Sequence, residues 1–358
     1  MNRSHAKSRT AKPPGRRRLR IGLVYDLRRE YLEAGYPEEQ VAEFDSDATL
    51  VVLEDTLRSL GLRPARIGNA RALCRRLADG ERWDLVFNIA EGLAGRSREA
   101  QAPAILELYE IPYTFSDPLT CAVTLDKAAA KALVREAGLR TPDYRVVRRP
   151  RDAARVDLPF PLFAKPLAEG TGKGIGVSSL IRSADALRRR CAALLRRYRQ
   201  PVLVEEFLPG REFTTGIVGT AGRAAVLGSM EVLIVPQGRQ AIYSFEVKEK
   251  SETMVRYTPL REPRMRRAVE SLALDCYRTL ECRDAARVDI RLDGAGRPAF
   301  LEVNPLAGLH PTHSDLPMIA TQEGWSYRDL IGAIVESAMA RAEGHVAGGR
   351  KKRSTSNA

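Results

Sequence analysis

Short apolar stretches alternate with helical patterns through the first part of the chain, and this alternation most constrains its fold. Apolar runs predict strands at residues 19–25, 63–67, 83–89 and 111–115. Between them, apolar side chains at helical spacing predict a helix over 46–60, a second after the 63–67 strand, and a third over 98–110. A chain that alternates in this way folds into a parallel, doubly wound sheet with helices on its faces, so we assign this part to the α/β class.

The pattern changes after residue 118. We predict helices at 125–137, 184–198 and 326–342, short strands at 144–147 and 161–165, and a strand-rich segment from residue 202. These changes divide the chain into an N-terminal α/β domain (20–118), a central subdomain (119–201) and a C-terminal domain (202–343). Residues 1–19 and 344–358 show no periodicity and are predicted to be disordered basic tails.

The net charge of +13 comes almost entirely from those tails. Residues 1–20 hold eight Lys or Arg, residues 350–358 hold four more, and neither segment holds Asp or Glu. Without these twelve, 46 basic residues face 45 acidic ones. The balanced body argues against nucleic-acid binding by the folded part, although tails of this kind can bind nucleic acid or acidic membrane in a salt-sensitive way. That binding function remains an alternative.

The chain shows no transmembrane or export signal. No apolar run approaches the ~20 residues that span a bilayer, and the apolar stretch at 21–25 is too short for a signal peptide. We therefore expect a cytoplasmic protein. The five cysteines are scattered with no CxxC pair, so we expect reduced packing residues. His310 and His313 with Asp315 nearby give too few ligands for zinc, and we expect them to contact substrate or pack in a loop.

A glycine-rich segment follows a predicted strand that ends in Lys165 and Pro166. Residues 170–176 contain four glycines and Lys173. Such a loop lets backbone N–H groups approach phosphate oxygens, while a lysine adds positive charge. It is not a P-loop, because residue 167 is leucine and Lys173 is followed by Gly174. We predict a glycine flap on a β-hairpin with a return strand at 177–181; the alternative is a plain surface turn.

Carboxylates cluster just after the predicted strand at 202–204. Glu205 and Glu206 end this strand, and Glu212 opens the next one. Acidic residues beside an apolar wall suit the amine of adenine and the hydroxyl groups of ribose. The alternative is that these glutamates are simply solvated at the strand ends.

Of the three segments with candidate functional residues, the segment 287–304 has the most specific pattern. It reads as a hairpin in which Arg287 and Asp289 share one face, as do Glu302 and Asn304 on the return strand. A turn that closes on residues 293 and 296 puts Arg287 opposite Glu302 and Asp289 opposite residue 300. Buried carboxylates are costly without a partner, and oxygen ligands suit Mg²⁺ bound to phosphates. The alternative is an arginine–carboxylate network inside the sheet.

These segments, in this order, resemble the ATP-grasp superfamily and, within it, the D-alanine–D-alanine ligase family. The likeness covers roughly residues 20–342 and is carried by six blocks: FNIAEG at 87–92, IPYTFSDPLTCAVTLDK at 111–127, AKP with EGTGKGIGVS, VEEFLPGREFT, RVDIRLD, and LEVNP with GL and THSDLPM. The resemblance implies an ATP-grasp fold, with an N-terminal parallel sheet followed by central and C-terminal α+β domains. It also implies an ADP-forming ligase that uses ATP and Mg²⁺, makes a dipeptide through an acyl phosphate, and serves peptidoglycan biosynthesis, commonly as a homodimer.

The resemblance also assigns roles to residues. Two lysines, Lys127 and Lys165, resemble those that hold the nucleotide phosphates. The flap would cover the phosphates with Glu169, Gly170, Thr171, Gly172, Lys173 and Gly174. The adenine and ribose contacts would come from Glu205, Glu206, Leu208 and Glu212.

The same comparison implies the catalytic set. Lys248 resembles the lysine that reaches the γ-phosphate, and Arg287 resembles the arginine that stabilises the developing oxyanion, with the N–H of Gly308 as a second donor. The Mg²⁺ ligands would be Asp289, Glu302 and Asn304.

The N-terminal substrate block departs from the family pattern. A longer, charged stretch follows Asp26, and within it Glu43 stands in for the family's catalytic glutamate. Glu91 and Gly92 occupy the place of a histidine–glycine pair, and Ser314 keeps a hydroxyl position near the substrate. The ATP half therefore matches the family and the amino-acid half does not, so an alternative is a ligase of the same chemistry for a different acid or amine.

Overall fold

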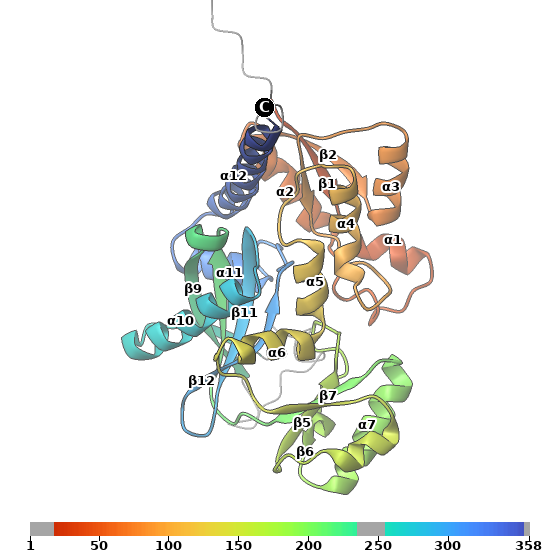
Figure 1. The fold of residues 1–358 in the computed structure, drawn as a ribbon, viewed down its shortest axis with the longest axis vertical. Helices are drawn as coiled ribbons and strands as arrows, with labels where there is room; N and C mark the ends of the chain where they lie inside the picture. The colour runs from red at the N-terminus through yellow and green to blue at the C-terminus, as the bar shows by residue number, and fades with distance from the viewer. Residues whose placement is uncertain (1–17, 235–254, 354–358) are drawn as a thin grey trace, which may run out of the picture.

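The computed structural model describes residues 18–234 and 255–353, without the side chains of 234 and 344–353. The chain forms three sheets in succession (Figure 1). The first is parallel, with the order β2-β1-β3, and confirms the fold expected from the alternating pattern. Its elements are β1 (Arg20–Val24), α1 (Arg28–Glu33), α2 (Asp47–Ser59), β2 (Arg63–Gly68), α3 (Ala70–Ala78), β3 (Leu85–Asn88) and α4 (Gln101–Leu108).

The second sheet is antiparallel and lies at the far end of the molecule from the first (Figure 1). Its order is β4-β7-β5-β6. A 3₁₀-helix and a long helix, η2 and α7, pack against each other beside it. Its elements are β4 (Tyr144–Val147), η2 (Pro150–Arg155), β5 (Leu162–Pro166), η3 (Val177–Ser179), β6 (Leu180–Ile181), α7 (Ala184–Tyr198) and β7 (Val202–Glu206).

The third sheet, also antiparallel, has the order β10-β9-β8-β11-β12. Its elements are β8 (Glu212–Val218), β9 (Ala225–Ile234), β10 (Val255–Pro259), α10 (Pro263–Thr279), β11 (Ala285–Leu292), β12 (Pro298–Asn304), α11 (Asp315–Gln322) and α12 (Tyr327–Arg353). Two short helices, α5 (Pro118–Leu125) and α6 (Lys127–Glu136), connect the first sheet to the rest. In the described residues no helix is long and apolar enough to cross a membrane.

Several local predictions are wrong in an informative way. The strand expected at 111–115 is reduced to one bridge between Tyr113 and Val86. The helix expected at 125–137 begins only at Lys127, because the Asp126 side chain caps it by accepting bonds from the N–H groups of Ala128 and Ala129. The return strand expected at 177–181 consists of a 3₁₀ turn and two strand residues.

The predicted register of the hairpin is also wrong. Arg287 pairs with Asn304, and Asp289 pairs with Glu302. Two changes produce this shift: the turn closes with Asp293 N–H donating to Arg297 O at 2.9 Å, and a β-bulge leaves Leu301 without a partner on β11. The two predicted ligands Asp289 and Glu302 are therefore direct neighbours across the sheet.

The C-terminal helix runs beyond its predicted end at about residue 342. The backbone of 344–353, expected to belong to a disordered tail, continues α12 to Arg353. The predicted tail segments 1–17 and 354–358 lie outside the described residues.

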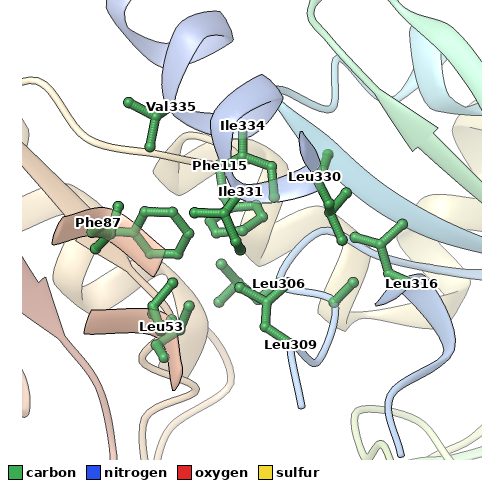
Figure 2. Close-up of a cluster of buried hydrophobic side chains, with 14 of the residues drawn as sticks. Leu53, Phe87, Phe115, Leu306, Leu309, Leu316, Leu330, Ile331, Ile334 and Val335 are labelled. Atoms are coloured by element: carbon green, nitrogen blue, oxygen red, sulfur yellow. The ribbon is translucent and has the colours of Figure 1, made fainter. Parts of the chain in front are cut away.

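The main hydrophobic core joins the two ends of the chain (Figure 2). Leu53 of α2 and Phe87 of β3 contribute from the first sheet, while Ile331 and Ile334 contribute from α12. All four side chains are completely buried. The residues after β12, including Leu306 and Leu309, pack into the same cluster. The loop that follows the β11–β12 hairpin is thereby held against the N-terminal domain.

One buried carboxylate ties these parts together. Asp284, which has no exposed surface, accepts hydrogen bonds from the Phe115 N–H and from the hydroxyl groups of Thr220 and Ser337. It also forms an ion pair with Arg341, at 2.6 Å between Nη2 and Oδ2. Asp284 thus links the end of the first sheet, the third sheet and α12.

We expect Asp284→Ala to lower the free energy of unfolding by about 3–5 kcal/mol, because it leaves the partly buried Arg341 without its main partner. Urea denaturation measures this loss. The exposed Asp79 offers a control, since Asp79→Ala should change stability by no more than about 0.5 kcal/mol. Equal effects of the two substitutions would contradict the role given to Asp284.

Candidate active site

Two pockets meet between the three sheets. The first, here called the flap pocket, lies among β5, β7, the flap at 169–176 and strands β8, β11 and β12. The second, here called the N-terminal pocket, lies between residues 42–49 and the loop at 302–314. Both are lined by Thr171, Tyr257, Arg287 and Glu302. The two pockets therefore adjoin at these four residues.

Buried lysines and glutamates alternate beside the flap pocket. The Glu205 carboxylate forms ion pairs with Lys165 through one oxygen and with Lys131 through the other, each at 2.9 Å. Glu302 lies 3.4 Å from the Nζ of Lys127 and 3.8 Å from that of Lys165. Burial lowers the pKa of Lys165, but Glu205 and Glu302 outweigh it and raise the pKa above its usual value. Lys165 therefore stays protonated, ready to bind a phosphate.

The Arg287 guanidinium lies where the pockets join. It forms ion pairs with Asp315, at 2.5 Å, and with Asp289, at 3.0 Å. Burial alone would lower the pKa of Arg287. The two carboxylates outweigh this effect and raise the pKa above its usual value, so the guanidinium stays charged. The amide of Asn304 donates to the same Asp289 oxygen at 3.4 Å. Arg287 is thus fixed in orientation at the point where the two bound groups would meet.

The two carboxylates of the hairpin suit a hard cation. The pKa of Asp289 is raised to about 6. Burial is the largest cause, Glu302 and Asp315 also raise this pKa, and Arg287 lowers it. Burial would also raise the pKa of Glu302, but Lys127 and Lys165 hold it at about 2. Ionised carboxylates this close repel each other, and a divalent cation would relieve the repulsion. Together with Asn304 they form an oxygen donor set that fits Mg²⁺.

The structure gives no support to a histidine-based metal site. The rings of His310 and His313 lie against each other with centroids 4.5 Å apart and planes tilted by 36°. Among the described residues, no group of three or more His, Cys, Asp or Glu could hold a metal ion. The loop carrying these histidines instead lines the N-terminal pocket, where Ser314 Oγ accepts a bond from the His310 N–H at 3.0 Å.

Comparison with known proteins decides the family. The family model described as "D-ala D-ala ligase C-terminus" matches residues 133–336, more than half of the chain. The D-alanine–D-alanine ligase of Gluconobacter oxydans is 36% identical over 263 residues, covering 72% of this chain and 82% of its own. The chain belongs to the D-alanine–D-alanine ligase family.

Two further relatives agree with this assignment. The D-alanine–D-alanine ligase of Sinorhizobium fredii is 31% identical and covers 86% of this chain and 96% of its own. The solved structure of the Bacillus anthracis D-alanine–D-alanine ligase complexed with ATP superimposes with a TM-score of 0.68 at 21% identity, covering 91% of this chain and 99% of that chain. This confirms the ATP-grasp fold expected from the sequence.

Most residues singled out by the ligase resemblance line the two pockets. The flap pocket includes Lys165, Thr171, Gly172, Glu205, Glu206, Leu208, Glu212, Arg287, Asp289 and Glu302. The N-terminal pocket includes Glu43, Glu91, Lys127, Glu169, Gly170, Asn304, Gly308 and Ser314. Three others, Gly92, Lys173 and Gly174, lie outside the walls of these pockets. Lys248 lies outside the described residues.

The outlying residues have identifiable contacts. The Gly92 N–H donates to Asp26 Oδ2 at 2.8 Å, so this position binds the end of β1. Gly174 has φ +68°, and a Cβ there would lie 2.6 Å from Pro166, so only glycine fits its turn. Lys173 reaches Glu43 with its Nζ 3.0 Å from Oε2.

Some site residues were missed. Lys131 lies one helical turn after Lys127, and this spacing placed both lysines on one face of α6. Asp315, which orients Arg287, comes from the start of α11 and could not be paired with it before the fold was known. Arg291 likewise pairs with Glu212 across the sheet at 2.9 Å.

The wall of the N-terminal pocket is unusually acidic. Burial raises the pKa of Glu99 to about 7, with Arg98 lowering it and Glu43 raising it. Burial likewise raises the pKa of Asp45 to about 7. The pKa of Glu91 is raised well above its usual value by burial and then by Glu99. At neutral pH these carboxyl groups are therefore partly or largely protonated, and a bound cationic group would favour their ionised forms.

These shifts predict a pH-dependent effect on stability. The folded-state pKa of Glu99, about 7, lies above its ordinary value of 4.5. Between these two pKa values the unfolded chain ionises Glu99 while the folded protein keeps it protonated, so stability falls as the pH rises from about 4.5 to about 7 and the full loss is present above 7. We expect Glu99→Gln to raise the free energy of unfolding by on the order of 2 kcal/mol at pH 8 and to have little effect at pH 5. Urea denaturation at both pH values tests this, and an equal change at both would show that Glu99 acts through packing instead.

Proposed function

We propose that the protein joins two small substrates, an acid and an amine, as an ADP-forming ligase, and that the acid is activated as an acyl phosphate. Family membership supports an ATP-dependent dipeptide ligase. One observation carries the detailed proposal: strands β11 and β12 bring the Arg287 guanidinium and the carboxylates of Asp289 and Glu302 to the junction of the two pockets. ATP would occupy the flap pocket and the acid substrate the N-terminal pocket.

The first step transfers a phosphoryl group. A carboxylate oxygen of the acid attacks the γ-phosphorus, the bond to the ADP oxygen breaks, and an acyl phosphate forms. Lys127 and Lys165 would bind the phosphates and offset their charge, while Glu205 and Glu212 would contact the adenine and ribose. Lys248 would reach the γ-phosphate. When bound by Asp289, Glu302 and Asn304, Mg²⁺ supplies further charge neutralisation.

The second step forms the amide. The amine nitrogen attacks the acyl carbon, a proton leaves the nitrogen, and the carbon–oxygen bond to phosphate breaks as phosphate departs. Negative charge develops on the acyl oxygen before that bond breaks. Arg287, fixed by Asp289 and Asp315, would stabilise this charge, with the N–H of Gly308 as a second donor. The remaining task of the protein is to keep water away from the acyl phosphate.

A second candidate is the same chemistry with an acid or amine other than D-alanine. The acidic wall around Glu91 and Glu99 favours it, because Glu91 replaces the histidine expected from the ligase resemblance. Under this reading the wall would bind a cationic group of the substrate. Mg²⁺, a cytoplasmic location and a homodimer remain predictions within either version.

The test is ADP release with panels of D- and L-amino acids, including ones with a second amino group, and mass spectrometry of the products. We expect ADP release that depends on the amino acid and matches formation of a dipeptide. Tight ATP binding with no amino-acid-dependent ADP release from any panel member would contradict the proposed function. Release with dibasic amino acids but not with D-alanine would favour the second candidate.

A further inference from the structure

The charged stretch that departs from the ligase pattern packs against the flap. Residues 37–45, here called the clasp, form consecutive turns in which Gln40 N–H donates to Pro37 O and Phe44 N–H donates to Val41 O, both at 3.0 Å. The Asp45 N–H donates to Asp26 O at 3.1 Å, which fixes the clasp to the end of β1. The clasp is therefore hydrogen-bonded to the N-terminal domain.

Glu43 connects the clasp to the flap. Its Oε2 lies 2.9 Å from Arg98 Nη2 and 3.0 Å from Lys173 Nζ. The side chains of all three residues are at most 8% exposed. At Gly170 the flap backbone approaches so closely that a Cβ would lie 2.3 Å from Glu43 Oε1. This is a buried, charge-paired contact between the N-terminal domain and the flap of the central subdomain.

Further contacts hold both ends of the same interface. Arg98 also donates to Ala168 O, just before the flap, at 2.9 Å. At the outer end of the clasp, Glu39 forms an ion pair with Arg197 and accepts a bond from the Tyr198 hydroxyl, each at 2.6 Å. The clasp thus contacts the flap on its inner side and the end of α7 on its outer side.

The ammonium group of Lys173 makes its ion pairs within this interface. Its Nζ lies 3.0 Å from Glu43 and 3.3 Å from Glu169, and it also approaches the Gln40 carbonyl at 3.5 Å. It lies outside the walls of the flap pocket, where Lys165 is present. A lysine with three oxygen neighbours of its own serves the contact between flap and clasp better than it serves a phosphate.

We propose that Lys173 is a positioning residue, which acts through Glu43 to hold the flap closed on the clasp while the acyl phosphate exists. This inference rests on the proposed function. With the flap closed, the amine takes the acyl group. With the flap open, water attacks the acyl carbon instead, its oxygen forms the new bond, the bond to phosphate breaks, and the original acid is regenerated. Each such event consumes one ATP without forming an amide.

The proposal predicts uncoupled turnover. In the wild-type protein the ratio of ADP released to amide formed should be about one, and Lys173→Met should raise it about threefold or more. Glu43→Gln should do the same. The double variant should be no more uncoupled than the worse single variant, because both substitutions remove the same contact, the one between Lys173 and Glu43. Lys173→Arg, which keeps the cation, should restore a ratio close to that of the wild type.

The matched control is Arg29→Met, which removes exposed ion pairs with Glu33 and Asp47 in the N-terminal domain without touching the flap. It should leave the ratio unchanged. Slower turnover of Lys173→Met with a ratio that stays at about one would overturn the proposal, since a residue that only binds nucleotide or stabilises the fold lowers both products together.

A second measurement does not depend on the substrates. In the ATP-bound protein, Lys173→Met and Glu43→Gln should each speed amide hydrogen exchange in both the flap and the clasp, but not in β11 or β12. Unchanged exchange in both segments would overturn the proposal even if the ligase activity is confirmed. Faster exchange in a protein that shows no amino-acid-dependent ADP release would support the clasp contact and count against the proposed function instead.

Discussion

Asp289→Asn should lower ligase turnover by about a thousandfold or more while the protein remains folded. The substitution removes the carboxylate that pairs with Arg287 at 3.0 Å and faces Glu302 across the sheet. In the proposed reaction this carboxylate binds the metal that neutralises the transferred phosphoryl group and orients the guanidinium. The loss should therefore appear in kcat, measured as ADP release at saturating substrates.

The fold should survive because asparagine has nearly the same shape as aspartate and, being neutral, is not repelled by Glu302 and Asp315. Asp289 lies close to Glu302 and Asp315, and both raise its pKa. The urea midpoint of Asp289→Asn should accordingly be equal to or higher than that of the wild type. Arg297→Lys, which keeps the charge beside Asp293 in the exposed turn of the same hairpin, is a control expected to retain turnover. Normal turnover in Asp289→Asn would refute the metal assignment.

Arg287→Met should lower turnover by at least about a hundredfold, the usual effect of removing one donor to a developing oxyanion. It also leaves Asp289 and Asp315 close together without the cation between them. We therefore expect a second effect, a loss of stability of about 3 kcal/mol that shrinks when the pH is lowered and Asp289 protonates.

Arg287→Lys separates the two effects. A lysine keeps the charge, so most of the stability should return, but it cannot reproduce the planar donor pair that now contacts Asp315 and Asp289. Turnover should remain low in this variant. If Arg287→Lys restored turnover completely, Arg287 would serve as a simple counter-charge and the oxyanion role would be wrong.

Much of the fold was visible in the sequence because it follows from local periodicity. The parallel sheet, the helices over 46–60 and 184–198, and the hairpin at 287–304 depend on apolar spacing that a chain shows directly. The errors arise where a single side chain or an extra residue intervenes. Asp126 ends α5 and caps α6, so the predicted helix begins two residues late, and the bulge at Leu301 interrupts the alternation along β12, where Ala299 and Phe300 are both buried.

The candidate site was predictable where its residues lie on one motif and not where they converge from distant parts. Lys165 and Glu302 were found from their own motifs. The partners that hold this site, such as Lys131 beside Glu205 and Asp315 beside Arg287, depend on how separate elements pack. The clasp is the clearest example, because its charged sequence appeared only as a departure until Glu43 was seen to contact Lys173.

The most direct test of the account follows oxygen from the acid substrate. The acid is labelled with ¹⁸O in its carboxylate and supplied with ATP and the amine found active in the amino-acid panels. Attack of the carboxylate on the γ-phosphorus predicts that one labelled oxygen appears in inorganic phosphate for each ADP and each amide formed. Unlabelled phosphate, or AMP in place of ADP, would contradict the acyl-phosphate mechanism.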